Sequence, residues 1–268
     1  MVPLSAKSPA RGRYRELVSS GAEPVYARAP AGWLAIPAAI ACVLLLLGQA
    51  TDFDLLVTRY VFNAHTGEFP LRLNFWFDVV LHHWTKYIVM TVAALTIAGL
   101  GLTFMLPPLK VHRRVLTFLA LALCLAPLSV SIAKTTSARH CPWDVIEFGG
   151  DVPYERLFEP NAVGVDPGRC FPAGHASTGF ALMAFYFAAY SRRARRAARN
   201  WLLAGIVAGV ALGLGRVVQG AHFISHVLWA GLLCWIVMVA LYRVCLSGAP
   251  SRDAAIALRI VDEGGLTP

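Results

Sequence analysis

The stretch WLLAGIVAGVALGLGRVVQGAHFISHVLWAGLLCWIVMVALY, residues 201–242, decides the fold. It holds two apolar runs, 201–218 and 222–242, each close to the roughly 20 residues that a helix needs to cross the hydrocarbon core of a membrane. Where the two runs meet stands RVVQGAHFISH, residues 216–226, with one arginine and two histidines. Ionisable groups are costly at membrane depth, so their presence there indicates a functional site.

The whole chain has the composition of a polytopic membrane protein. Of its 268 residues, 57% are hydrophobic and only 15% are charged, which is far from the balance of soluble globular domains. Further apolar segments of similar length predict an all-α integral membrane protein, a bundle of six transmembrane helices. The predicted spans are residues 33–50, 87–106, 114–133, 173–190, 201–218 and 222–242.

The distribution of charge predicts the orientation of the bundle, because short cytoplasmic connections are rich in Lys and Arg. The arm 1–30, the connection around 110–114 and SRRARRAARN, residues 191–200, are all basic. The connection 134–172 carries six acidic residues and is expected to face outward. These are Asp144, Glu147, Asp151, Glu155, Glu159 and Asp166. The net charge of +9 is therefore interpreted as a topology signal rather than a nucleic-acid surface.

The Ala- and Arg-rich composition suggests a bacterial source, so we expect a multi-pass protein of a bacterial inner membrane. Residues 31–246 form the six-helix domain, with the arm 1–30 and the tail 247–268 in the cytoplasm and the loop 134–172 in the periplasm. Between the first two spans, aromatic and charged residues interleave, which predicts amphipathic helices at the outer interface.

Polar residues gather in three clusters on the predicted outer side. The first is Lys134 with Arg139 and HCPW, the second is CFPAGHAS, residues 170–177, and the third is Arg216 with His222 and His226. If the bundle brings the clusters together, they form one cationic pocket. Basic side chains and the free N–H groups of a helix start bind phosphate, and Gly174 lets an anion approach the backbone closely.

Two histidines supply the chemistry that such a pocket needs. One imidazole can attack phosphorus while another protonates the departing oxygen. His175 and His222 could share these tasks if they face each other across a phosphoryl group.

The three clusters resemble the signature motifs of the phosphatidic acid phosphatase type 2 superfamily. The family's first motif, Lys, six residues, Arg-Pro, corresponds to Lys134 followed by Cys141-Pro142. Its Pro-Ser-Gly-His corresponds to PAGH, residues 172–175. Its Ser-Arg, five residues, His, three residues, Asp corresponds to Gly215-Arg216, His222 and His226. The resemblance covers about residues 112–242.

The resemblance implies a membrane lipid phosphatase with a phosphohistidine intermediate and no metal or other cofactor. By position, His222 is the nucleophile and His175 the general acid. The phosphate ligands would be Lys134, Arg216 and the backbone of Ala173 and Gly174.

Three positions depart from the family pattern, where Arg becomes Cys141, Ser becomes Ala173 and Asp becomes His226. We expect the His226 imidazole to accept a hydrogen bond from His222 as the carboxylate would, or Asp144 or Glu147 to supply the missing charge. Arg139 is expected to replace the guanidinium lost at position 141. The Ser177 hydroxyl is a candidate to replace the phosphate contact of the serine that is lost at Ala173.

Cys141 has one cysteine partner on the predicted outer side, Cys170. We hypothesise a disulfide between them, since an extracytoplasmic compartment permits it. Closing a loop of about 30 residues would stabilise the fold by roughly 3–4 kcal/mol in the chain-entropy estimate.

Three other functions stay open. His222 and His226, four residues apart, could be zinc ligands with His175 or Cys141, although Lys134 and Arg216 would repel a cation. A lipid phosphotransferase would use the same intermediate, and an anion or lipid transporter could use the same basic pocket. The candidate substrates are phosphatidylglycerol phosphate, phosphatidic acid, undecaprenyl pyrophosphate and phosphorylated lipid A, and the sequence does not fix the oligomeric state.

Overall fold

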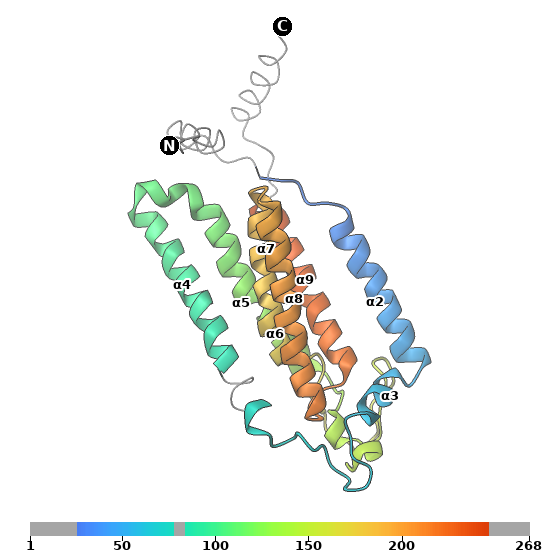
Figure 1. Ribbon diagram of the computed structural model, residues 1–268. Coiled ribbons are helices and arrows are strands. Elements are labelled where there is room, and N and C mark those ends of the chain that lie inside the picture. Colours follow the sequence, from blue (N-terminus) through green and yellow to red (C-terminus); the bar gives the residue numbers. More distant parts are fainter. Residues whose placement is uncertain (1–25, 78–83, 247–268) are drawn as a thin grey trace, which may run out of the picture.

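Long helices run side by side in the computed structural model, which describes residues 26–77 and 84–246 (Figure 1). Within those ranges the β structure is confined to two isolated bridges, Asn63 with Glu68 and Val145 with Val152. The prediction of an all-helical protein is therefore confirmed for the described residues.

Five helical segments are long and apolar enough to cross a membrane. Their bounds agree with five of the six predicted spans to within about one turn, except that two segments begin earlier, at Pro107 rather than 114 and at Arg195 rather than 201. They are α2 (Gly32–Ala50), α4 (Thr85–Met105, apolar from Tyr87), the 3₁₀ helix η2 (Pro107–His112) continuing into α5 (Arg113–Thr136), α8 (Arg195–Val218) and α9 (Ile224–Cys245).

The remaining predicted span, 173–190, is helical but interrupted. It consists of α6 (Gly174–Phe180), the 3₁₀ turn η5 (Ala181–Met183) and α7 (Ala184–Ser191). This segment packs against α5, α8 and α9, and many of its residues are fully buried. It is the central element of the bundle, although it is not one uninterrupted helix.

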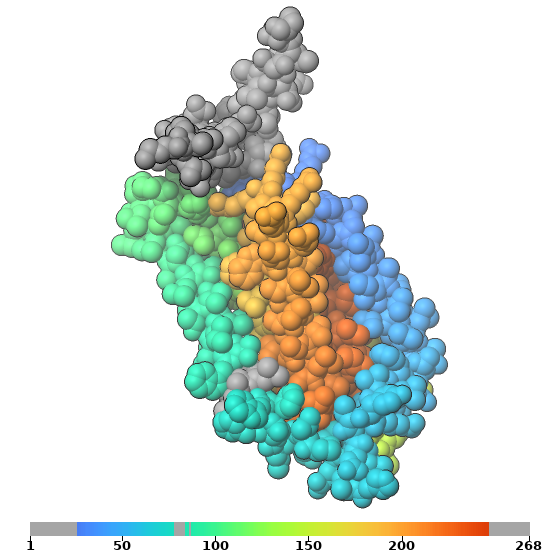
Figure 2. Space-filling view, in the orientation of Figure 1, coloured from blue at the N-terminus to red at the C-terminus, as the bar shows by residue number. Residues whose placement is uncertain are grey.

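Glycines on α8 explain how closely this central segment packs. Gly205, Gly209 and Gly213 recur every fourth residue, a spacing that places them on one face and lets helices in membranes approach closely. A Cβ atom built on Gly209 would lie 2.3 Å from the Phe180 ring of α6, and one on Gly205 would lie 2.6 Å from Cγ of Met183 in η5. On Gly213 it would lie 2.2 Å from Val227 of α9. Figure 2 shows α8, in orange, along the front of the molecule between α4 and α2.

The predicted start of one span was wrong. The helix α8 begins at Arg195, six residues before the predicted start at residue 201, because a helix can continue past the hydrocarbon while its arginines extend to the interface. Between the first two spans the structure describes one short α-helix, α3 (Phe53–Arg59), followed mainly by turns. Residues 78–83, in the second half of this connection, lie outside the described residues. His82 and His83 of this connection are among the residues that the structure does not describe.

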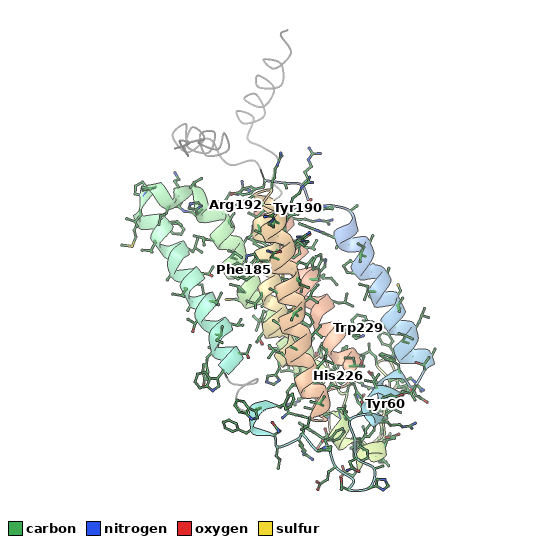
Figure 3. The ribbon with its side chains drawn as sticks, in the orientation of Figure 1. Tyr60, Phe185, Tyr190, Arg192, His226 and Trp229 are labelled. Carbon is green, nitrogen blue, oxygen red and sulfur yellow. A yellow bond between two sulfur atoms is a disulfide. The ribbon has the colours of Figure 1, made fainter. Side chains whose placement is uncertain are left out.

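A small apolar cluster attaches the outer segments to the bundle. Leu55 of α3, Phe69, Val145, Phe148 and Phe223 are buried together. Val145 lies between two short 3₁₀ turns, η3 (Pro142–Asp144) and η4 (Ile146–Phe148), and Phe148 is the last residue of η4. The cluster holds the connection 137–173 over the end of the bundle where α9 starts, which is the end that carries His226 (Figure 3).

Basic connections lie at the opposite end. The α4–α5 and α7–α8 connections share that end in Figure 1, and Arg192 is labelled there in Figure 3. The two ends of the bundle therefore differ in charge as the sequence predicts.

Candidate active site

The three polar clusters meet at one end of the bundle. Lys134 lies in the last turn of α5, Arg216 in the last turn of α8, and His175 in the first turn of α6. His222 lies in the α8–α9 connection, and His226 in the first turn of α9. The helices that carry them pack against one another, so residues more than 80 positions apart share one site.

Two glycines shape the backbone of the site. Gly174 opens α6, and a Cβ atom there would lie 4.0 Å from Cδ of Lys134, so the lysine side chain lies beside the helix start. Gly220 has φ +72°, a conformation that favours glycine. A Cβ atom on Gly220 would lie 2.4 Å from the Phe69 ring. The turn at Gly220 brings the chain back toward α9 and places His222; the sequence analysis did not identify this role.

His222 is buried in a basic environment, with 2% of its surface exposed. Burial lowers its pKa well below the usual value, and the nearby His226, Lys134, His175 and Arg216 lower it further. At neutral pH the imidazole is therefore uncharged and keeps a nitrogen lone pair, as a nucleophile requires.

The groups around His222 differ from those expected. All the charged or titratable groups that shift its pKa are basic, and neither Asp144 nor Glu147 is among them. A carboxylate oxygen of Asp144 instead accepts a hydrogen bond from the backbone N–H of Cys141 at 3.2 Å. Among the described residues, the missing aspartate of the third motif is therefore not replaced by an outer-loop acid.

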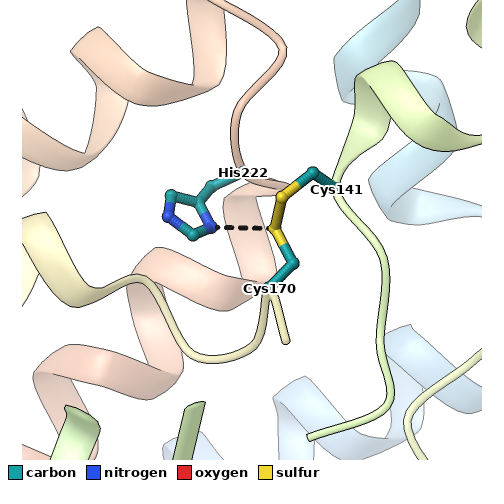
Figure 4. Close-up of side chains that lie close together, drawn as sticks. All are labelled: Cys141, Cys170 and His222. Atoms are coloured by element: carbon teal, nitrogen blue, oxygen red, sulfur yellow. Dashed lines mark hydrogen bonds between the residues drawn. A yellow bond between two sulfur atoms is a disulfide. The ribbon is translucent and has the colours of Figure 1, made fainter. Parts of the chain in front are cut away.

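Cys170 contacts the nucleophile candidate. Cys141 and Cys170 form a disulfide with Cα atoms 5.3 Å apart, and Sγ of Cys170 lies 3.4 Å from Nδ1 of His222 (Figure 4). The disulfide thus joins the end of the first motif to the segment before the second and lies against the third.

His226 does not make the contact predicted for it. Its ring centroid is 5.8 Å from that of His222, and its buried Nδ1 has no hydrogen-bond partner among the described residues. Its imidazole is hydrogen bonded to the backbone of Cys170, and its carbonyl accepts the N–H of Ala173 at 3.0 Å. These contacts give His226 the task of holding the turn that precedes α6.

Arg139 is engaged by the outer loop. Its guanidinium pairs with Glu155 at 3.3 Å and donates to the carbonyls of Arg156 and Glu159 and to the Asn161 side chain. These contacts do not support the prediction that Arg139 holds a phosphate. Ser177 is also engaged, since its hydroxyl donates to the Gly174 carbonyl at 2.6 Å.

Arg216 is positioned by residues that the sequence analysis did not identify. Its guanidinium donates to Oε1 of Gln219 at 2.8 Å, and Gln219 is fully buried and donates to the Arg72 carbonyl. The centroid of the Trp143 ring lies 4.8 Å from the Arg72 guanidinium and 5.9 Å from that of Arg216. No pattern in the sequence links position 72 or 143 to position 216.

Asp54 is a further site-forming residue that was missed. Its carboxylate accepts the N–H of Ser225 at 3.0 Å and the Ser225 hydroxyl at 2.5 Å. Ser225 lies in the first turn of α9, so Asp54 caps the helix that follows His222. Burial raises the pKa of Asp54, while the hydrogen bonds from Ser225 lower it.

A pocket adjoins this cap. Its lining includes Leu44 and Leu45 of α2 together with Phe171, Trp229 and His226; His226 and Trp229 are labelled in Figure 3. The pocket therefore connects the apolar face of α2 with the polar end of the bundle.

One set of described residues has the spacing of a metal site. Cys141, Cys170 and His222 offer ligand atoms within 4.8 Å of one another. Because thiolates are the cysteine ligands of metals, the disulfide in this structure leaves His222 as the one conventional ligand of the three.

The arrangement fits an anion better than a cation. Lys134 and Arg216 present positive charge next to the start of α6. The uncharged imidazole of His222 lies close to both of these side chains. A tetrahedral oxyanion would compensate that charge, and a neutral imidazole beside it can act as nucleophile or base.

Comparison with known proteins agrees with this chemistry. The sequence pattern of the PAP2 superfamily matches residues 115–246, which carry all three clusters. The lipid A 4'-phosphatase of Francisella tularensis subsp. novicida (strain U112) is 31% identical over 173 residues, 61% of this chain and 75% of the relative. No solved structure matches the chain. With a family match over the site and a relative aligned over three quarters of its length, the chain belongs to the PAP2 superfamily of membrane phosphatases.

Proposed function

We propose that the protein hydrolyses a phosphate monoester of a membrane lipid and that the reaction passes through a phosphohistidine at His222. The observation that carries the proposal is the buried, uncharged imidazole of His222 among Lys134, His175 and Arg216. A nucleophile in that place can reach an anion that the surrounding charges hold.

The chemistry assigns one task to each group. Nε2 of His222 attacks phosphorus, and the leaving alkoxide takes a proton from His175. Lys134, Arg216 and the first N–H groups of α6 stabilise the negative charge of the five-coordinate transition state. Water then hydrolyses the phosphohistidine, with His175 acting as the base.

Phosphorylated lipid A is the substrate that we propose first, because the relative described above is named for that activity. Phosphatidylglycerol phosphate, phosphatidic acid and undecaprenyl pyrophosphate are the other lipids to be compared with it. The pocket beside α2, with Leu44, Phe171 and Trp229 in its wall, supports a substrate with an apolar chain.

We further propose that α6, η5 and α7 together cross the membrane, which brings the number of spans to six. Six spans put both termini on the basic side, which is cytoplasmic by the positive-inside rule. The site would then face the periplasm, where the phosphate groups of lipid A in the outer leaflet are accessible.

Phosphate release by the purified protein tests the function. Each of the four lipids is supplied in detergent micelles, and inorganic phosphate is measured for the wild type, His222→Ala and His65→Ala. The last is a matched control, because His65 is exposed in the turn after α3. We expect release from lipid A that His222→Ala abolishes and His65→Ala preserves.

Other results would contradict the proposal. Equal release by His222→Ala and the wild type would remove His222 as the nucleophile. Transfer of the phosphate to a second lipid without release of inorganic phosphate would identify a phosphotransferase, and lipid movement across liposomes without cleavage would identify a transporter.

A further inference from the structure

The disulfide lies directly against the proposed nucleophile. Cys170 is completely buried, and its Sγ is 3.4 Å from Nδ1 of His222 and 3.2 Å from the Ala221 carbonyl oxygen. Figure 4 shows the His222 ring with Nδ1 turned toward the two sulfurs.

No acidic group takes part in this contact. The third motif has His226 where the family has aspartate, and Nδ1 of His226 has no hydrogen-bond partner among the described residues. The charged or titratable neighbours that act on His222 are basic. Within the described part of the chain, Cys170 is thus the side chain in hydrogen-bond contact with Nδ1 of His222.

The bonding of the sulfur determines what it can do for the ring. A disulfide sulfur carries no hydrogen and can only accept, so a hydrogen bond to it requires the hydrogen on Nδ1. In neutral imidazole this leaves the lone pair on Nε2, the atom that attacks phosphorus in the proposed function. A thiol at the same place can donate its S–H to Nδ1, which favours the tautomer with hydrogen on Nε2.

We propose that the Cys141–Cys170 disulfide is a positioning group that selects the nucleophilic tautomer of His222, so that phosphatase activity depends on the redox state of this pair. The inference rests on the proposed function of His222. Cys170 acts through His222 and does not touch the substrate.

Reduction of the pair is a two-electron step. A thiolate of dithiothreitol attacks Sγ of Cys141, which is partly exposed, and the S–S bond breaks with Cys170 as the leaving group. The second thiol of dithiothreitol closes its cyclic disulfide, and the protein gains two hydrogens as two thiols. Cys170 is completely buried, and burial favours a thiol over a thiolate.

The first test compares the oxidised and reduced wild-type protein. EDTA is present throughout, since two thiols and His222 could take up a metal ion. Losing one well-placed hydrogen bond is worth about 1 kcal/mol, so we expect reduction to lower kcat roughly fivefold to tenfold and to change KM less than about twofold. Reoxidation should restore kcat, and alkylation followed by mass spectrometry gives the fraction reduced.

Two variants separate tautomer control from a simple structural staple. Cys141→Ala leaves Cys170 as a thiol that can donate, whereas the double variant Cys141→Ala/Cys170→Ala leaves no donor. We expect the double variant to be more active than the single one by about threefold. A staple alone would make the two variants equally impaired. Cys124→Ser, an exposed cysteine of α5, is the control and should match the wild type.

The tautomer itself is visible in the ¹⁵N chemical shifts of the His222 ring, assigned by their loss in His222→Ala. Oxidised protein should show a protonated Nδ1, and reduced protein a shift toward a protonated Nε2. Unchanged ring shifts and unchanged kcat after complete reduction would overturn the inference while leaving the proposed function intact. Activity that survives His222→Ala would instead overturn the proposed function.

Discussion

At the scale of single residues, the sequence predicted which positions meet but not all of their contacts. The spacing of the motifs was sufficient to predict that Lys134, His175, Arg216 and His222 lie close together, as they do in the structure. It could not show that His226 holds the turn before α6, because a hydrogen bond to the Cys170 backbone depends on how α9 lies against that turn. Asp54 was missed for the same reason, since its partner Ser225 is 171 residues away.

The lowered pKa of His222 predicts the acid limb of the pH profile. Protonation removes the nucleophile, so kcat/KM should fall only as the pH drops through a pKa that lies below the usual 6.5 of histidine. Lys134→Met removes a cation that lowers this pKa, so its residual activity should have its acid limb at higher pH. The measurement is kcat/KM from acidic to alkaline pH for both proteins, and an unshifted limb would argue against His222 as the titrating group.

The Asp54 cap predicts a stability effect. Asp54→Ala leaves the N–H and hydroxyl of Ser225 without their acceptor, and loss of such a cap costs about 1–2 kcal/mol. Thermal unfolding in detergent should show a lower midpoint. Asp52→Ala is the control, because Asp52 is more exposed and pairs with Arg156 at the surface, where ion pairs contribute little. Equal midpoints for the two variants would refute the role of Asp54.

At the scale of elements, hydropathy identified the five long spans because each has a continuous apolar stretch. It identified the central segment 173–190 but not its 3₁₀ interruption, which accompanies close packing against the glycines of α8. The start of α8 was missed because helical hydrogen bonding continues through the arginines 195–199, where a polarity pattern already indicates a loop.

The glycine packing predicts opposite effects for two similar substitutions. Gly209→Ala places a methyl group against the Phe180 ring, and overpacking of this kind costs about 1–3 kcal/mol. Gly101→Ala, in the open face of α4, meets nothing within 4 Å and should be neutral or stabilising by up to about 1 kcal/mol. Thermal unfolding of both variants checks this, and a Gly209→Ala protein as stable as the wild type would contradict the packing argument.

At the scale of the whole molecule, charge separation between the two ends predicts the orientation in the membrane. The sequence predicted that separation from the connections alone, because the positive-inside rule needs no tertiary structure. The outer cap could not be predicted, since its cluster of Leu55, Phe69, Val145, Phe148 and Phe223 joins short segments without periodicity.

Orientation can be measured with single cysteines. Val163 is fully exposed in the outer connection, and Arg196 is exposed near the start of α8. In intact spheroplasts, a membrane-impermeant maleimide should label Val163→Cys at once and Arg196→Cys only after permeabilisation. The reverse labelling pattern would place the site in the cytoplasm.

The central claim is that His222 becomes phosphorylated during turnover, and the most direct measurement is its capture. Protein reacting with lipid A is quenched at alkaline pH within milliseconds and digested with trypsin, which releases the peptide from residue 217 to residue 243. We predict one phosphate on this peptide, located at His222 by fragmentation and absent from unreacted protein. Turnover with the phosphate on His226 or His175 instead, or with no phosphorylated histidine, would contradict the account.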